Sequence, residues 1–253
     1  MGFDGVTLAV PSSLRCFLPA GERRPELRLS VDGTSTVGHL LAAVGVPKTE
    51  VGDVIVDDLA VDLRYRPQPD DRISVHPVAW PQSAPTSPPL FVLDVHLGTL
   101  ARRLRLLGLD VVYDRHADDD ALLETSLTQQ RVLLTRDRGL LHRRALRSGA
   151  HVNAEVPDEQ LREVLDRFAP PLQPWTRCLT CNGTLADAPK SEVRAQLQDG
   201  TRRCYSTFRR CRACGHIYWR GAHAGRLQAI VDAAAHGREA GAAPTTADGR
   251  HPA

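Results

Sequence analysis

Short apolar runs alternate with amphipathic stretches between residues 91 and 169, and this alternation constrains the fold more than any other feature. Four runs have the length and residue types of buried strands: FVLD at 91–94, DVVYD at 110–114, RVLLT at 131–135 and AHVNA at 150–154. Leucine spacing, Gly108 and Pro157 predict helices between and after them, at 97–107, around 122–127, at 139–148 and at 157–168. Strands that alternate with helices form a parallel sheet with helices on both faces, so we expect an α/β domain here.

Carboxylate or amide side chains follow every predicted strand: Asp94, Asp114, Asp137 and Asn153, with the acidic run 118–120 close behind the second strand. Ligands of such sheets bind beyond the carboxyl ends of the strands. Carboxylates gathered there raise one another's pKa unless a cation neutralises them, and hard oxygen ligands favour Mg²⁺ or Mn²⁺. Such an ion can activate water for displacement at phosphorus. Arginines able to hold phosphate stand nearby in sequence: Arg102, Arg103, Arg105, Arg136 and Arg138.

Each acidic residue also has a simpler interpretation. Asp118, Asp119 and Asp120 can cap a helix or complement its dipole, and Asp137 can cap the helix that follows it. Asp114 is typical of a surface turn. Asp94 is harder to explain in this way, because a carboxylate directly after a buried strand is costly unless it is used.

Four cysteines form two C-x-x-C pairs: Cys178, Cys181, Cys211 and Cys214. Twenty-nine residues separate the pairs, a gap that a β-hairpin insertion can fill. Four thiolates complete a tetrahedral shell, so we expect a closed, structural Zn²⁺ site with tight turns at Gly183 and Gly215. Cys16 and Cys204 have no partner at such spacing. Metal-binding cysteines suit a reducing compartment, and residues 1–20 lack the apolar core of a secretory signal, so a cytoplasmic protein is expected.

Positive charge is concentrated around the cysteines. Residues 170–226 contain 10 Lys and Arg against 3 Asp and Glu, whereas residues 1–78 contain 8 against 11. Arg209 and Arg210 lie among Tyr205, Phe208, Tyr218 and Trp219, a mixture that suits phosphate contact and base stacking. RNA is therefore the expected partner; the alternatives are a solvated basic face and aromatic residues that merely cover the ribbon.

Residues 1–78 predict a separate small domain with strands at both ends, one helix near residues 37–44 and a hairpin after it. This pattern resembles the β-grasp fold of ubiquitin-like sulfur carriers. Those carriers end in Gly-Gly, and the corresponding end here is SVHPVAW, so we expect docking, to a protein partner or to the rest of the chain, rather than sulfur transfer. Residues 79–90 hold four prolines and predict a linker, and residues 237–253 predict a disordered tail. No run approaches the length of a membrane span.

The motifs FVLDVHLGTLARRLRLLGLDVVYD and RVLLTRDRGLL, the acidic run between them and the cysteine segment resemble the Mut-seven C-terminal ribonuclease domain, a branch of the PIN-like nucleases. The resemblance implies a metal-dependent ribonuclease in which Asp94, then Asp118 or Asp119, then Asp137 bind Mg²⁺ or Mn²⁺ and act in catalysis. The arginines near these acids, Arg102, Arg105, Arg136 and Arg138, and those of the cysteine segment, Arg209 and Arg210, are expected to contact RNA. A fourth acid of PIN domains falls near Asn153, and this amide favours the alternative of a non-catalytic RNA-binding protein with the same fold.

Overall fold

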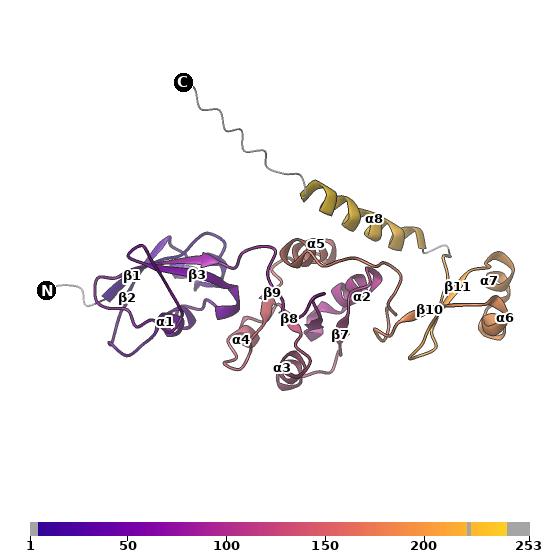
Figure 1. Ribbon diagram of the computed structural model, residues 1–253, viewed down its shortest axis with the longest axis horizontal. Coiled ribbons are helices and arrows are strands. Elements are labelled where there is room, and N and C mark those ends of the chain that lie inside the picture. The colour runs from indigo at the N-terminus through magenta and orange to yellow at the C-terminus, as the bar shows by residue number, and fades with distance from the viewer. Residues whose placement is uncertain (1–4, 222–223, 242–253) are drawn as a thin grey trace, which may run out of the picture. The chain divides into compact units, whose positions relative to one another are not determined.

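A computed structural model describes residues 5–221 and 224–241 (Figure 1). The chain divides into two compact units, and the first contains the residues up to 98 together with residues 111–153. The second contains residues 99–110 and the chain from residue 154 onward. No helix within the described ranges is both long and apolar enough to span a membrane.

The N-terminal part of the first unit is a five-stranded sheet with one main helix, as expected for a β-grasp domain. Its strands lie in the order β2-β1-β5-β3-β4: β1 (Gly5–Ala9), β2 (Glu26–Ser30), β3 (Val51–Val56), β4 (Leu59–Val61) and β5 (Arg72–Pro77). β1 pairs antiparallel with β2 and parallel with β5. Thr36 caps helix α1 (Val37–Ala43) by accepting the N–H of His39, and Gly45 follows at a φ of 92°. Apolar side chains of alternate strand positions form the core with α1.

The second part of the first unit is a four-stranded sheet, and every pairing in it is parallel. Its strands lie in the order β7-β6-β8-β9: β6 (Phe91–Leu93), β7 (Val111–Tyr113), β8 (Val132–Thr135) and β9 (Gly149–His151). All residues of β6 and β8 are buried, which explains their unbroken apolar runs. The chain leaves β6 for β7 on one side and returns to β8 on the other. The strand order therefore reverses between β6 and β8, the position where such sheets bind ligands.

Helices α3 (Asp119–Thr128) and α4 (Arg138–Leu141) contact this sheet (Figure 1). Leu122, Leu133 and Leu140 belong to the apolar cluster that holds them there. The sequence predicts a longer helix over 139–148, but α4 ends after one turn. The physical reason is the run from His142 to Arg147, in which only Leu146 is buried, so a continued helix would have no apolar stripe.

The second unit contains helices α2 (Gly98–Leu106), apart from Gly98, and α5 (Pro157–Phe168). After α2, Gly108 takes a φ of 87°, and an added Cβ would lie 2.0 Å from the carbonyl oxygen of Gln173. Gly108 is thus required both by its backbone conformation and by a close approach.

The cysteine-bearing segment forms a three-stranded antiparallel sheet of β10 (Leu185–Ala188), β11 (Phe208–Cys211) and β12 (Ile217–Tyr218). Short helices α6 (Lys190–Val193) and α7 (Asp199–Cys204) fill the gap between the first two strands. A small core of Ala188, Val193, Leu197 and Phe208 holds them. Helix α8 (Ala224–Gly241), which contacts α5, is not predicted by the sequence analysis. It includes residues 237–241 of the expected tail, whereas residues 242–253 lie outside the described residues.

Candidate functional site

Asp94 is a buried carboxylate at the carboxyl end of β6, only 3% exposed. Its Oδ1 accepts the N–H of His96 at 2.8 Å and so caps the short helix η4 (Val95–Leu97). Its Oδ2 accepts the N–H of Arg136 at 2.9 Å and the hydroxyl of Thr135. Three donors from two chain segments therefore hold the buried charge in one orientation, which offsets the cost of burying it.

The Thr135 hydroxyl joins the ends of β6 and β8. It donates to Asp94 and accepts the N–H of Asp137 at 2.8 Å, and Thr135 itself is fully buried. Asp137 is exposed and caps α4 through Oδ1, which accepts the N–H of Gly139 at 2.7 Å. Asp94 and Asp137 thus lie at the same edge of the sheet, where the strand order reverses.

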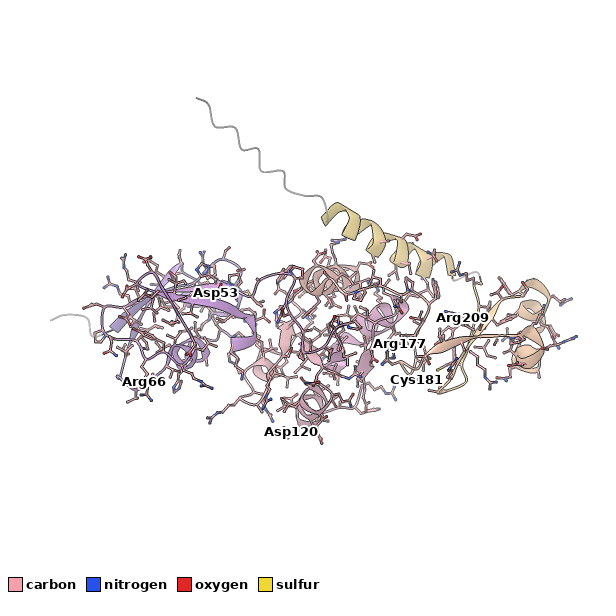
Figure 2. The ribbon with its side chains drawn as sticks, in the orientation of Figure 1. Asp53, Arg66, Asp120, Arg177, Cys181 and Arg209 are labelled. Carbon is pink, nitrogen blue, oxygen red and sulfur yellow. The ribbon has the colours of Figure 1, made fainter. Side chains whose placement is uncertain are left out.

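The acidic run 118–120 lies at the start of α3 and is exposed. Asp118 caps the helix, with Oδ1 accepting the N–H of Ala121 at 2.8 Å, and Asp120, which is labelled in Figure 2, forms an ion pair with Arg143. Asp119 occupies the first turn. Among the described residues, these acids do not form a group of three at metal-binding separations with Asp94 and Asp137. Asp114 is an exposed turn residue whose Oδ1 accepts the N–H of His116, and Asn153 is exposed after β9.

The four cysteines, by contrast, form a compact group whose ligand atoms all lie within 4.8 Å of one another. The sulfur atoms of Cys178 and Cys214 are 3.7 Å apart, and those of Cys181 and Cys211 are 3.5 Å apart. Zn–S bonds of about 2.3 Å in a tetrahedron separate the sulfur atoms by roughly 3.8 Å. The four side chains can hold a metal ion, and their spacing fits Zn²⁺.

Glycine has a different role at each of the two C-x-x-C turns, residues 178–181 and 211–214, which we call the knuckles. Gly215 takes a φ of 74°, as the sequence predicts, but in the first knuckle the positive φ of 68° belongs to Asn182. At Gly183 the requirement is space, since an added Cβ would lie 2.9 Å from Sγ of Cys211. A side chain there would displace a thiol of the group.

Hydrogen bonds make the four thiols unequal. Burial alone would raise the pKa of Cys178, but the Tyr218 hydroxyl, 3.1 Å from its sulfur, and the N–H groups of Cys181 and Thr180 lower that pKa to about 6. Burial raises the pKa of Cys181 to about 12, with the neighbouring thiols acting in the same direction. The group therefore does not carry four thiolates at neutral pH without a cation, as expected of a metal site.

The expectation that Arg105 contacts RNA is not met, because its side chain is buried and supports the first knuckle. It is 3% exposed, and its Nη1 donates to the carbonyl oxygens of Leu179 and Thr180 at 3.1 and 2.9 Å. Asp110 adds a second contact from the segment after α2: it accepts a hydrogen bond from Asn182 at 2.8 Å and forms an ion pair at 2.9 Å with Arg177, which is labelled in Figure 2. A cation beside four thiolates also offsets their negative charge. The sequence analysis missed this role, and no local signal carries it, since Arg105 and Leu179 are 74 residues apart.

The other arginines that are expected to contact RNA differ in the contacts they make within the protein. Arg102, Arg136 and Arg210 are exposed. The Arg138 guanidinium lies 5.6 Å from the ring centroid of Phe17 in the β-grasp domain. Arg209 donates to Asp187 at 2.9 Å and to the carbonyl oxygen of Trp175. Arg138 and Arg209 are thus partly committed to the fold.

Comparison with known families agrees with this geometry. Residues 89–231 match the profile of the Mut7-C RNAse domain, and residues 4–83 match that of Mut7-C ubiquitin. No curated protein and no solved structure gives a significant match. The first match covers more than half of the chain. It spans both the sheet edge that carries Asp94 and Asp137, here called the aspartate edge, and the cysteine knuckles. The chain belongs to the Mut7-C RNAse domain family and has a Mut7-C ubiquitin domain at its N-terminal side.

Proposed function

We propose that the protein is a metal-dependent ribonuclease whose reaction takes place at the edge formed by β6 and β8. One observation carries the proposal: buried Asp94 is joined through the Thr135 hydroxyl to the backbone of Asp137 where the strand order reverses. A buried carboxylate with three donors is more than a helix cap needs. The match to the RNAse domain supports hydrolysis of an RNA phosphodiester bond.

The donor set at this edge suits a hard divalent ion. A carboxylate offers about four lone-pair sites; Asp94 uses three of them, and Asp137 uses one in capping α4. Both can still offer an oxygen ligand, and Mg²⁺ or Mn²⁺ commonly completes its shell with water and substrate phosphate. Such an ion, when bound, would lower the pKa of a water molecule and neutralise charge that develops on phosphorus-bound oxygens.

The remaining residues of the edge position the reacting groups. Thr135 and the N–H of Arg136 hold the Asp94 carboxylate, so its orientation does not depend on the ion. Asp118 or Asp119, both exposed at the start of α3, would supply a further ligand, and the helix cap made by Asp118 does not exclude it, since Asp137 also caps a helix. The exposed side chain of Arg136 adds positive charge at this edge, which attracts the RNA backbone, and Arg102 is an exposed cation of the second unit.

The cysteine group is proposed to hold one structural Zn²⁺. Four thiolates leave no open coordination position for substrate, and the ion would join the turn that precedes β10 to the turn between β11 and β12. The positive charge of this segment then forms a surface for RNA, with Arg210 exposed on β11.

The β-grasp domain is proposed to support the nuclease edge and, through its remaining surface, to bind a protein partner. The Glu50 carboxylate accepts the N–H of His151 in β9 at 2.7 Å, and Glu50 is 6% exposed. Lys48 donates to the Arg144 carbonyl at 2.9 Å, and Phe17 lies under Arg138, which directly follows Asp137. The domain thereby contacts the segment that carries one of the proposed ligands.

The test is cleavage of fluorescently labelled single-stranded and hairpin RNA by the full-length protein, with Mn²⁺ or with EDTA. Cleavage is expected only with the metal, and Asp94→Asn and Asp137→Asn should each lower the rate at least about 100-fold. Asp114→Asn is the matched control, because Asp114 is an exposed strand-end aspartate with only a local backbone bond. Equal rates for all three variants would contradict the proposed site.

The second candidate function is RNA binding without catalysis. Two observations favour it: Asn153 stands where PIN domains often have an acid, and no three acids approach one another among the described residues. RNA binding that persists in EDTA, together with no cleavage in Mg²⁺ or Mn²⁺, would establish this alternative.

A further inference from the structure

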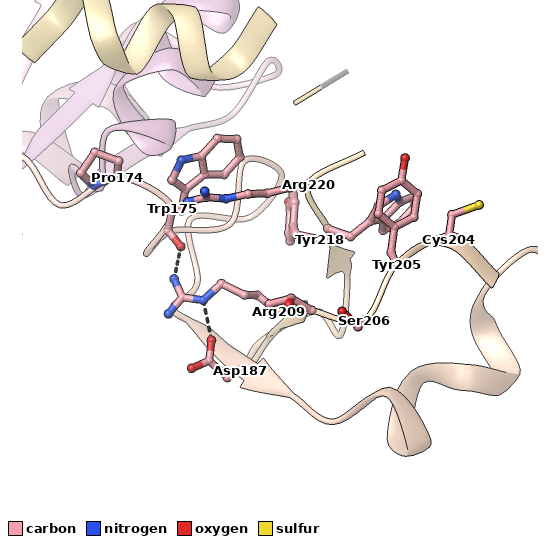
Figure 3. A pocket seen from close by; sticks show the side chains of 11 residues that line it. Pro174, Trp175, Asp187, Cys204, Tyr205, Ser206, Arg209, Tyr218 and Arg220 are labelled. Carbon is pink, nitrogen blue, oxygen red and sulfur yellow. Dashed lines mark hydrogen bonds and ion pairs between the residues drawn. The ribbon is translucent and has the colours of Figure 1, made fainter. Parts of the chain in front are cut away.

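An open cavity lies on the cysteine-bearing segment (Figure 3). Its volume is about 530 Å³, within the range of roughly 300–1,000 Å³ that holds small ligands. Four aromatic residues line it: Trp175, Tyr205, Tyr218 and Trp219. Its other lining residues are polar or charged apart from Pro174 and Cys204, and among the described residues no Leu, Ile, Val or Met lines it. Such a wall suits a planar aromatic ligand that has polar edges.

The cavity is built rigidly on one side and left open on the other. Trp175 and Tyr205 lie on opposite sides, and Arg209 runs along the wall between them (Figure 3). Arg209 is fixed by the Asp187 carboxylate and by the carbonyl oxygen of Trp175. Trp219, in contrast, is 40% exposed. An exposed aromatic at the rim of an aromatic cavity is positioned to meet a ligand.

The backbone at Trp175 is in an unusual conformation. Its φ of 66° lies in the left-handed region, which bulky side chains rarely adopt, and its N–H is held by the carbonyl oxygen of Leu106 at 2.9 Å. Its indole Nε1 is buried and has no hydrogen-bond partner in the part of the chain that the structure describes. Strain of this kind persists where surrounding contacts enforce it and is concentrated at functional sites.

The charged residues of the cavity lining indicate which kind of planar ligand fits. Asp187 is paired with Arg209, so Arg220 supplies the remaining charge of the lining, with its guanidinium 5.8 Å from the Trp175 ring centroid. Arg203 and Arg210 are exposed nearby in the sequence, and the whole segment has a net charge of +7, from 10 basic and 3 acidic residues. An anionic ligand with aromatic rings fits this combination, and single-stranded nucleic acid has both features.

We propose that this cavity binds an unpaired base of the RNA substrate, stacked on Trp219, with the adjacent phosphate against Arg220. The inference rests on the proposed ribonuclease function for the choice of RNA, and it deepens that function by naming single-stranded RNA as the preferred substrate class. A base inside a duplex is stacked on its neighbours, so double-stranded RNA cannot enter the cavity without unstacking.

The test measures binding separately from cleavage. Full-length protein with Asp94→Asn, which is designed to prevent cleavage, is titrated against labelled oligouridine of about twelve nucleotides, with fluorescence anisotropy as the readout. Trp219→Ala should weaken binding about tenfold, whereas Trp219→Phe, which keeps a ring, should recover most of the affinity. Trp80→Ala is the matched control, since Trp80 is 53% exposed but lies in the linker, and it should have no effect.

Two results would overturn the proposal: Trp219→Ala binding oligouridine as tightly as the parent protein, or a duplex of the same length binding as tightly as the single strand. Zinc content is measured for every variant, so that loss of the fold is recognised, and Trp219→Phe provides a second, conservative test if Trp219→Ala loses zinc. Absence of cleavage by the wild-type protein, with the binding pattern intact, would contradict the ribonuclease proposal but not this site.

Discussion

The two candidate metal sites differ in how their ligands come together. At the knuckles, each C-x-x-C turn brings two thiols together locally, and the pairing of β10 with β11 brings the two turns together. At the aspartate edge, the proposed ligands come from separate chain segments, and Asp94, Asp118 and Asp137 each also have a structural partner. The knuckles have the geometry of a complete ligand shell, whereas among the described residues the acids of the edge do not form a group of three at metal-binding separations.

The closeness of two acids, such as Asp94 and Asp137, is therefore not enough to identify them as metal ligands. A carboxylate that caps a helix and one that binds an ion can occupy the same position, and Asp137 illustrates both uses. The thiols have no competing structural role of that kind. Substitutions can separate the structural role of each ligand residue from its role in binding metal.

The largest effect is expected from Cys178→Ser. Structural zinc in small domains contributes about 10–16 kcal/mol of apparent binding free energy, so losing a buried ligand should release the ion and unfold the sheet of β10–β12. Zinc content by atomic absorption and the melting temperature measure both outcomes. The exposed Cys204 is the control, and Cys204→Ser should keep about one ion per chain. Retention of zinc and of the melting temperature in Cys178→Ser would mean that the knuckles are not a metal site.

Replacing Asp94 with alanine should destabilise the protein far more than replacing Asp137. Asp94→Ala leaves the Thr135 hydroxyl and two N–H groups without their acceptor, at a cost of about 3 kcal/mol or more. Asp137→Ala removes an exposed helix cap, at a cost of about 1 kcal/mol. Urea denaturation without added Mg²⁺ or Mn²⁺, with the zinc content of each variant checked, measures both values without a contribution from metal at the edge. Similar values for the two variants would show that the hydrogen bonds of Asp94 are not what holds this edge together.

Arg105→Met should cost about 2 kcal/mol, because the carbonyl groups of Leu179 and Thr180 lose their donor. It should also speed zinc release to a chromophoric chelator, since residues behind the ligands tune metal affinity. Arg102→Met is the control on the same helix, because Arg102 is exposed. A larger effect from Arg102→Met would refute the assignment of Arg105 to the knuckle.

The smallest effect concerns pH and the Tyr218 hydroxyl. The pKa of Cys178 is lowered to about 6 from its ordinary value near 9, so the stabilised thiolate is fully favoured above pH 9 and is lost as the pH falls through about 6. Tyr218→Phe removes one cause of the lowering, and zinc should then be released at a higher pH during acidification. A chelator-based titration from pH 8 to pH 4 measures the shift. Release at an unchanged or lower pH would remove Tyr218 from the support of the thiolate.

Local patterns were sufficient to predict much of this architecture. The unbroken apolar runs correctly indicate the strands β6 and β8, and the cysteine spacing predicts the compact thiol group. The cap at Asp118 also follows from its position before Leu122. These features depend on residues that are close in sequence, where side-chain chemistry and periodicity decide the structure.

Long-range contacts account for what the sequence did not reveal. The use of Arg105 depends on the approach of Leu179 and Thr180, and the link between Asp94 and Asp137 depends on Thr135, 41 residues after Asp94. Helix α8 was missed, although Leu227, Ile230, Val231 and Ala234 fall at helical spacing in its sequence. Helix α4 ends early because the residues that follow it, apart from Leu146, are not buried. This pattern of burial is not visible in the sequence.

The most direct test of the aspartate edge is anomalous diffraction from crystals of the zinc-loaded protein soaked in Mn²⁺. The account predicts a manganese peak with carboxylate oxygens of Asp94 and Asp137 within about 2.4 Å, and no such peak in Asp94→Asn crystals. Manganese bound elsewhere, or an edge without manganese in crystals whose other sites are filled, would contradict it.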